Sequence, residues 1–152
     1  METRKFFIIC NAVAVFVAPL IVLFGRFAGG NAGWLVVIFL FGGFLAVSGG
    51  YLILLLVGLM LGDGRSRFDR SLKVLWWFGA AATTFAMWLI PDAGDAPNSE
   101  TVLLDFGSMD KETAIEINSR LSEIFGILGV LSFFGWILLC IVDRVRRHAA
   151  HR

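Results

Sequence analysis

The sequence predicts an all-α integral membrane protein with four transmembrane helices in a bundle. Hydrophobic residues make up 58% of the 152 positions and charged residues only 16%, whereas a soluble domain carries about 25% charged residues. Four apolar stretches are each long enough to cross the hydrocarbon core of a bilayer, which takes roughly 20 helical residues. This composition excludes a soluble enzyme, a nucleic-acid-binding domain and a disordered regulator. We therefore expect one four-helix membrane domain over residues 1–152.

The helical spans are expected at about 6–24, 34–61, 72–90 and 124–142. The first two stretches hold no charged residue, and the third holds only Lys73, whose ammonium group can reach the headgroups from the end of a helix. The first stretch follows Arg4 and Lys5, as the core of a secretory signal would, but 20 uncharged residues are long for such a core. We therefore expect a retained first helix.

The connections between the spans predict the orientation, since Arg and Lys in short loops favour the cytoplasmic side. The N-terminus, the connection between the second and third spans, and the basic tail at 143–152 together hold ten basic and four acidic residues. The other side holds three basic and eight acidic residues. Both termini are therefore expected in the cytoplasm, with the 33-residue loop at 91–123 outside. Arg outnumbers Lys by ten to three, which favours a GC-rich bacterial genome, so the expected location is a bacterial inner membrane.

The second half of the outer loop is predicted to form an amphipathic helix that continues into the fourth span. Ser108 or Asp110 suits the N-cap position, and no Gly or Pro follows before Gly126. Apolar residues recur at spacings of three and four along one face: Ala114, Ile117 and Leu121. This stripe either docks a partner outside the membrane or packs on the chain's own loop at 102–106.

Two ridges of small residues favour close helix packing, because small side chains let helix backbones approach each other in lipid. The ridge on the second span is Gly42, Ala46, Gly50, Gly58 and Gly62, and the ridge on the fourth is Gly126, Gly129, Ser132 and Gly135. Either the ridges pack against other helices of the same bundle, or one of them forms a groove for another protein or a second copy.

A belt of polar side chains is expected near the middle of the bilayer. Its members are Ser48, Tyr51, Thr83, Thr84 and Ser132. Such hydroxyl groups usually bond to carbonyls or to neighbouring helices, and the Tyr51 hydroxyl needs a partner at that depth. The alternative is a small polar pocket for a lipid, a quinone or another amphiphile.

The sequence offers no catalytic, cofactor-binding or metal-binding residues. Ion pathways and proton relays place ionisable side chains inside the hydrocarbon core, and none lies within the predicted spans apart from the terminal Lys73. Cys10 and Cys140 are expected to be ordinary thiols, since the cytoplasmic side is reducing. His148 and His151, the only histidines, lie in the basic tail beside the lipid headgroups.

The expected function is therefore that of a non-catalytic multi-pass membrane protein that binds another membrane protein. It would act as an accessory, assembly or immunity-type subunit, and not as an enzyme. The alternative is a homo-oligomeric channel or carrier, with an uncharged pore lined by the midplane Ser and Thr residues. The expected partners are membrane lipids and either another membrane protein or further copies of this chain, with no nucleic acid and no cofactor.

Overall fold

The computed structural model describes residues 2–28, 33–61, 66–92, 104, 107 and 110–150, and this part of the chain is all-helical. In chain order the elements are α1 (Thr3–Ala28), α2 (Trp34–Ile38), the π-helical turn η1 (Phe39–Gly43), α3 (Phe44–Leu59), α4 (Asp69–Leu89) and α5 (Lys111–Ala150). Since α2, η1 and α3 follow one another without a break, four helices are long and apolar enough to cross a membrane. The prediction of four apolar helices is confirmed.

Each predicted span coincides largely with one of these helices, although the limits differ. α3 ends at Leu59 and α4 at Leu89, before the predicted ends at 61 and 90, whereas α1 and α5 extend beyond both predicted limits. α1 runs on past residue 24 and takes in Arg26. α5 covers both the fourth span and the predicted amphipathic helix in one rod of 40 residues. The predicted continuity of these two segments is therefore confirmed.

Asp110 caps the first turn of α5. The backbone N–H of Thr113 donates to Asp110 Oδ1 at 2.9 Å, and the Thr113 hydroxyl donates to Asp110 Oδ2 at 2.6 Å. A carboxylate at this position satisfies an N–H that has no partner inside the helix, and it is also favoured by the helix dipole. Of the two predicted caps, Asp110 is the one that the structure places, while Ser108 lies outside the described residues.

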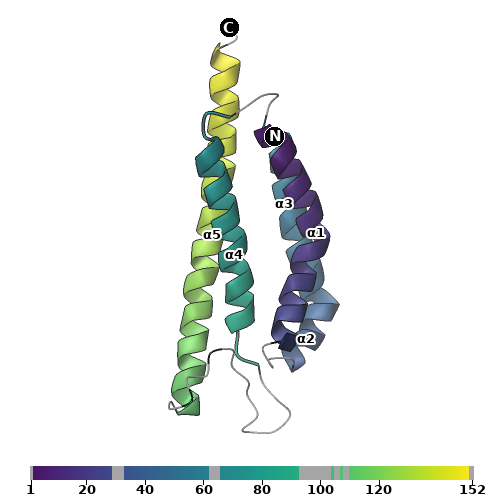
Figure 1. Cartoon of the computed structure of the whole chain (residues 1–152), viewed down its shortest axis with the longest axis vertical. Coiled ribbons are helices and arrows are strands. Elements are labelled where there is room, and N and C mark those ends of the chain that lie inside the picture. Colours follow the sequence, from purple (N-terminus) through teal and green to yellow (C-terminus); the bar gives the residue numbers. More distant parts are fainter. Residues whose placement is uncertain are drawn as a thin grey trace.

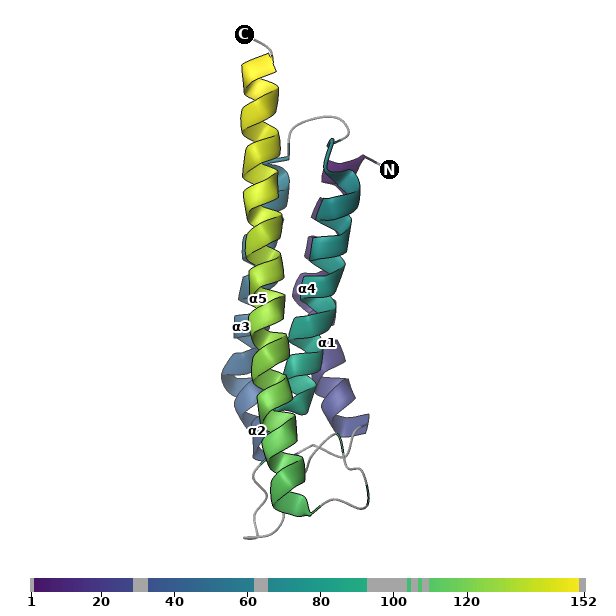
Figure 2. The ribbon, with the colours of Figure 1, turned by 90° about the vertical axis from the view of Figure 1, so that its left-hand side faces the viewer.

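The helices lie side by side in two pairs, α1 with α3 and α4 with α5 (Figure 1). The N-terminus and the C-terminal end of α5 lie at the same end of the molecule, and α5 extends beyond the other helices there (Figure 2). The contacts between the two pairs are far fewer than those inside each pair. The boundary between the pairs is therefore the least densely packed part of the interior.

Glycine explains the close approach of α4 to α5. A Cβ atom added at Gly129 would lie 2.5 Å from Thr83 Cγ2 and 3.2 Å from Gly79 O. One added at Gly79 would lie 3.1 Å from the Phe133 ring. Because these separations are too short for a side chain, the two helices depend on glycine at both positions.

The π-helical turn η1 separates α2 from α3 and contains Gly42 and Gly43. The Phe39 side chain folds back over Gly43, where an added Cβ would lie 2.5 Å from the ring. A π-helical turn is rare and inserts an extra residue into the helix, which changes the face that the following residues present.

An aromatic cluster joins the two pairs near the N-terminal end of α1. The Phe7 ring lies 5.1 Å from the Trp136 ring and 6.4 Å from the Trp76 ring, measured between centroids. Phe7 and Trp136 are completely buried, and Trp76 is nearly so. Aromatic side chains bury large apolar areas, so this cluster contributes a substantial apolar contact across the boundary.

Candidate functional site

The candidate site is the boundary between the two helix pairs, which we call the seam. One side of the seam consists of α1 and α3, and the other of α4 and α5. Polar contacts cross the seam near both ends of α1, and two grooves lie along it.

At the N-terminal end of α1, the buried Thr3 hydroxyl donates to Asp69 Oδ1 at 2.7 Å. Farther along α1, Asn11 makes a second polar contact across the seam and is fully buried. Trp76 Nε1 donates to Asn11 Oδ1 at 2.8 Å, and Asn11 Nδ2 donates to the Phe7 carbonyl at 2.8 Å. The Leu54 carbonyl lies 3.5 Å from the same Asn11 nitrogen. One amide group therefore connects α1 with both α3 and α4, and it satisfies the indole N–H at a depth where water is excluded.

Arg26 and Asp92 form an ion pair at the opposite end of the seam. Arg26 Nη2 lies 3.6 Å from Asp92 Oδ2, and the two side chains are only 3% and 1% exposed. Arg26 also donates to two carbonyls at the end of α4, to Met87 O at 2.6 Å and to Ile90 O at 3.2 Å. The guanidinium therefore caps the C-terminus of α4, where a cation is favoured by the helix dipole.

Asp92 in turn caps the N-terminus of α2. The backbone N–H of Gly33 donates to Asp92 Oδ2 at 2.6 Å, and that of Leu35 donates to Asp92 Oδ1 at 3.0 Å. Together with Arg26, this carboxylate ties the end of α1, the start of α2 and the end of α4 into one polar cluster, which we call the clamp. Buried charges are tolerated only when they are paired and hydrogen-bonded in this way.

Sequence reasoning missed both the clamp and Asn11. It counted Arg26 and Asp92 only as charges of the outer connections and did not consider an ion pair between them. A signal was present, because the two residues carry opposite charges and each follows a predicted span by two positions. Asn11 gave a weaker signal as an amide inside an apolar stretch.

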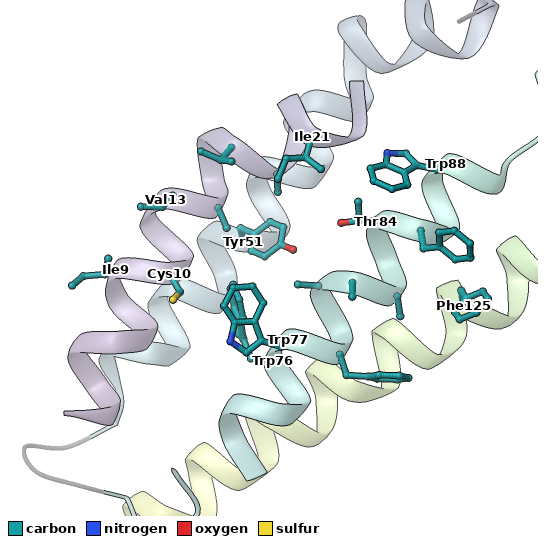
Figure 3. A pocket seen from close by; sticks show the side chains of 18 residues that line it. Ile9, Cys10, Val13, Ile21, Tyr51, Trp76, Trp77, Thr84, Trp88 and Phe125 are labelled. Atoms are coloured by element: carbon teal, nitrogen blue, oxygen red, sulfur yellow. The ribbon is translucent and has the colours of Figure 1, made fainter. Parts of the chain in front are cut away.

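The larger groove lies between α1 and α4 and has a volume of about 840 Å³. Its α1 side runs from Ile9 to Ile21, and its α4 side runs from Trp76 to Trp88. Figure 3 shows Tyr51 and Thr84 directed into the space between the two helices. The lining is otherwise apolar, with small alanine side chains on both helices and aromatic rings at its margins.

The smaller groove lies between α3 and α5 and has a volume of about 290 Å³. On α3 it is lined by Ala46 and Gly50, and on α5 by Phe133 and Phe134. Tyr51 lines both grooves, since it lies in the seam between them.

The two predicted ridges of small residues have different surroundings. The ridge on α5 faces the neighbouring helix α4. An added Cβ at Gly135 lies 3.6 Å from Leu75, and one at Gly126 lies 3.9 Å from Ala86. Gly129 packs tightly on α4, and Ser132 is buried. The ridge on the second span is divided. Gly58 is buried against Phe7, at 3.6 Å from an added Cβ, whereas added Cβ atoms at Gly42 and Gly50 meet no atom within 4 Å. Ala46 is also exposed, and Gly62 lies outside the described residues.

The side chains of the predicted polar belt form hydrogen bonds mainly within the chain. Ser48 Oγ donates to the Val15 carbonyl at 2.8 Å, which links α3 to α1. Thr83 Oγ1 donates to the Gly79 carbonyl at 2.8 Å, and the Tyr51 hydroxyl contacts the Thr83 side chain. Ser132 is buried on α5, and Thr84 lines the larger groove.

The stripe predicted on the amphipathic part of α5 lies at the edge of the buried face. Ala114 is buried, but Ile117 and Leu121 are only half-buried. The fully buried residue is Asn118, whose side-chain amide bonds to Leu104 through both its oxygen (3.2 Å) and its nitrogen (3.0 Å). The loop segment that the stripe was expected to contact is described only at Leu104 and is held there by this polar contact.

The described cysteine, histidine and acidic side chains form no metal-binding cluster. Cys140 is buried and Cys10 half-buried, and both are free thiols. Among the described residues, no three His, Cys, Asp or Glu side chains gather closely enough to hold a metal ion. His148 is exposed near the end of α5, and His151 lies outside the described part of the chain.

Comparisons of the chain with protein-family models, with curated proteins and with solved structures give no match.

Proposed function

We propose that this chain is a non-catalytic multi-pass membrane protein that binds a transmembrane helix of another membrane protein along the exposed small-residue face of η1 and α3. This face consists of Gly42, Ala46 and Gly50, and we call it the α3 ridge. The observation that carries the proposal is that the chain's own helices leave the ridge uncovered, with no atom within 4 Å of an added Cβ at Gly42 or Gly50.

The other glycines of the helices show what small residues do elsewhere in this chain. Gly58, Gly79 and Gly129 each admit a side chain or a backbone from a neighbouring helix. A lipid acyl chain adapts to large side chains, so contact with lipid alone gives no reason for a small-residue face. The α3 ridge has the composition of a helix-packing surface without a helix on it, which supports a partner from outside the chain.

The shape of the surrounding surface also favours a helix. Gly42 and Gly50 are eight residues apart, which is about 12 Å along a helix axis. The smaller groove continues the ridge toward α5, where the Phe133 and Phe134 side chains form the opposite wall. A helix with its own small residues at this position would approach the α3 backbone closely and contact these rings with its larger side chains.

The alternative function, a homo-oligomeric channel or carrier, requires the midplane hydroxyl groups to face a pore between copies. Ser48 and Thr83 instead donate to carbonyls of the same chain, and Ser132 is buried. This favours partner binding over a pore lined by these residues.

The proposal includes the orientation and the membrane expected from the sequence. Both termini lie in the cytoplasm of a bacterial cell, and α5 begins outside the inner membrane. The excess of basic residues at the end that holds both termini supports this orientation.

Site-specific photocrosslinking in native membranes tests the proposal. A photoreactive side chain at Ala46 should crosslink to one defined foreign membrane protein, whereas the same group at Leu138, which is 61% exposed on α5, should crosslink only to lipid. Gly50→Leu should abolish the Ala46 crosslink while leaving the melting temperature of the isolated protein unchanged, since a Cβ atom at this position meets no atom within 4 Å.

Gly129→Leu is the matched control for helix packing. Its side chain would collide with Thr83 and the Gly79 carbonyl, so it should lower the melting temperature, at a cost of about 1–3 kcal/mol for an overpacked contact. A crosslink from Ala46 only to another copy of this chain would overturn the foreign partner in favour of self-association. A crosslink only to lipid, unchanged by Gly50→Leu, would overturn the proposal entirely.

A further inference from the structure

We propose that the larger groove binds a single anionic phospholipid, with one acyl chain between α1 and α4 and the phosphate beside Lys73 and Lys5. This site is on the opposite side of the seam from the smaller groove, and it does not depend on the partner proposed for the α3 ridge.

The length of the groove suits an acyl chain. Its α1 lining runs from Ile9 to Ile21, and twelve residues of helix rise about 18 Å. One leaflet of a bilayer is about 15 Å deep, half of the hydrocarbon core. The groove is therefore long enough to take one acyl chain.

Small side chains keep the groove open. Ala14 and Ala18 line it from α1, and Ala80 and Ala81 line it from α4. Larger side chains at these positions would fill the space between α1 and α4. The groove is thus a feature of the side chains that line it and not only of the spacing of the helices.

One end of the groove is closed. The Trp88 indole lies across Gly25, in the space that a side chain at Gly25 would occupy. Immediately beyond it, Arg26 bonds to the Met87 carbonyl and to the rest of the clamp. Figure 3 shows Trp88 at one end of the groove and Ile9 and Trp77 toward the other. A headgroup must therefore lie beyond the Ile9–Trp77 end or at the open side.

Basic side chains lie at the Ile9–Trp77 end. Lys73 is one helical turn before Trp77, and its Nζ reaches across the seam to lie 5.2 Å from the centre of the Phe6 ring on α1. Lys5 is also at this end, and its side chain is 69% exposed. Both positions lie where a phosphate would follow an acyl chain out of the groove.

Each lysine also has an acidic neighbour. Lys73 Nζ lies 2.8 Å from Asp69 Oδ2, and Lys5 Nζ lies 3.4 Å from Glu2 Oε2. All four side chains are at least one-third exposed, and such ion pairs contribute little. An ammonium group has three N–H donors, so each lysine can bond to a phosphate oxygen without losing its carboxylate. A zwitterionic lipid would bring a second cation to these lysines and is therefore disfavoured.

Quenching of tryptophan fluorescence by brominated lipids tests the site, since Trp76, Trp77 and Trp88 line the groove. The protein is placed in phosphatidylcholine nanodiscs containing a fixed fraction of phosphatidylglycerol, with the bromine on the acyl chains of one lipid or the other. Wild-type protein should be quenched more strongly by brominated phosphatidylglycerol than by brominated phosphatidylcholine at the same mole fraction.

Separate variants test the contact with the headgroup and the contact with the acyl chain. Lys73→Gln and Lys5→Gln should each lower the preference for phosphatidylglycerol by about fivefold, whereas Lys73→Arg should retain it. Ala81→Leu, which fills the groove, should abolish the preference. Ala46→Leu, on the α3 ridge, is the matched control and should leave lipid quenching unchanged.

Equal quenching of wild-type protein by the two lipids would overturn the site, because it would show only the surrounding bilayer. A preference that survives both lysine substitutions would equally overturn it. If Ala81→Leu does not fold, the lysine series on the otherwise unchanged chain decides the question.

Discussion

Removing one member of the Arg26–Asp92 pair should destabilise the chain far more than breaking an exposed ion pair. Arg26→Met leaves the Asp92 carboxylate, which is 1% exposed, without its cation, and it leaves the Met87 and Ile90 carbonyls without their donor. Loss of one partner from a buried pair costs about 3–5 kcal/mol, because the remaining charge stays away from water. For a chain of this size each kcal/mol lowers the melting temperature by about 2–4 °C, so the expected fall is about 6–20 °C.

The assay is a thermal melt in detergent of four proteins: wild type, Arg26→Met, Asp92→Ala and the double variant. Asp92→Ala should cost a similar amount, since Gly33 and Leu35 lose the acceptor for their N–H groups. The double variant should be less destabilised than the sum of the single ones, because neither charge is then left alone. Coupling of this kind is typically about 0.5–3 kcal/mol.

Arg120 and Glu116 provide the matched control. They also form an ion pair between Arg and a carboxylate, at 2.6 Å, but their side chains are 73% and 63% exposed. Arg120→Met should cost about 1 kcal/mol or less. Two results would refute the argument that burial makes this pair important. One is a fall in melting temperature for the single clamp variants no larger than that of this control. The other is a double variant whose destabilisation equals the sum of those of the single variants.

Three further predictions concern the loop, the cap of α5 and the orientation. Asn118→Leu should remove the hydrogen bonds that hold Leu104 and lower the free energy of unfolding by about 1–3 kcal/mol for the lost buried partners. Proteases should then cleave the loop faster, and unchanged cleavage would contradict this prediction. Hydrogen bonds from the Thr113 hydroxyl, and secondarily from its backbone N–H, hold the pKa of Asp110 below the ordinary value of 3.8. The cap therefore stabilises α5 at pH values above 3.8, and this stabilisation is lost as the pH falls through the lower pKa of the folded state. The Thr113 amide resonance should therefore titrate below pH 3.8, and a midpoint at or above it would count against the cap. Arg67→Cys, at an exposed position, should react with an impermeant thiol reagent only from the cytoplasm in a chain without other cysteines, and labelling of intact cells would reverse the orientation.

The sequence alone predicted the helices because each one depends on local properties. In lipid every backbone N–H and C=O must bond within its own segment, so a long apolar stretch is enough to predict a helix. The absence of Gly and Pro before Gly126 likewise predicted the continuous α5. Asp110 was one of the two candidates predicted for its N-cap. None of these conclusions requires knowledge of which helix lies beside which.

The role of each small residue was decided only by the tertiary structure. Gly50 and Gly129 look alike in sequence, each in a regular series of small residues. Yet a Cβ atom added at Gly129 would collide with α4, while one added at Gly50 would meet no atom within 4 Å. The difference arises from the pairing of α4 with α5 and from the looser contact across the seam, which no local pattern contains.

Buried polar groups depend on the tertiary structure for the same reason. Spacing on α5 predicted an apolar stripe through Ala114, Ile117 and Leu121, whereas the buried face runs from Ala114 to Asn118. An amide can be buried there because Leu104 offers its own N–H and carbonyl, just as Arg26 can be buried because Asp92 and the end of α4 lie beside it. Hydrophobicity along the chain determines which segments enter the membrane, but the partners of a buried polar side chain lie far away in sequence, and only the fold brings them within hydrogen-bond distance.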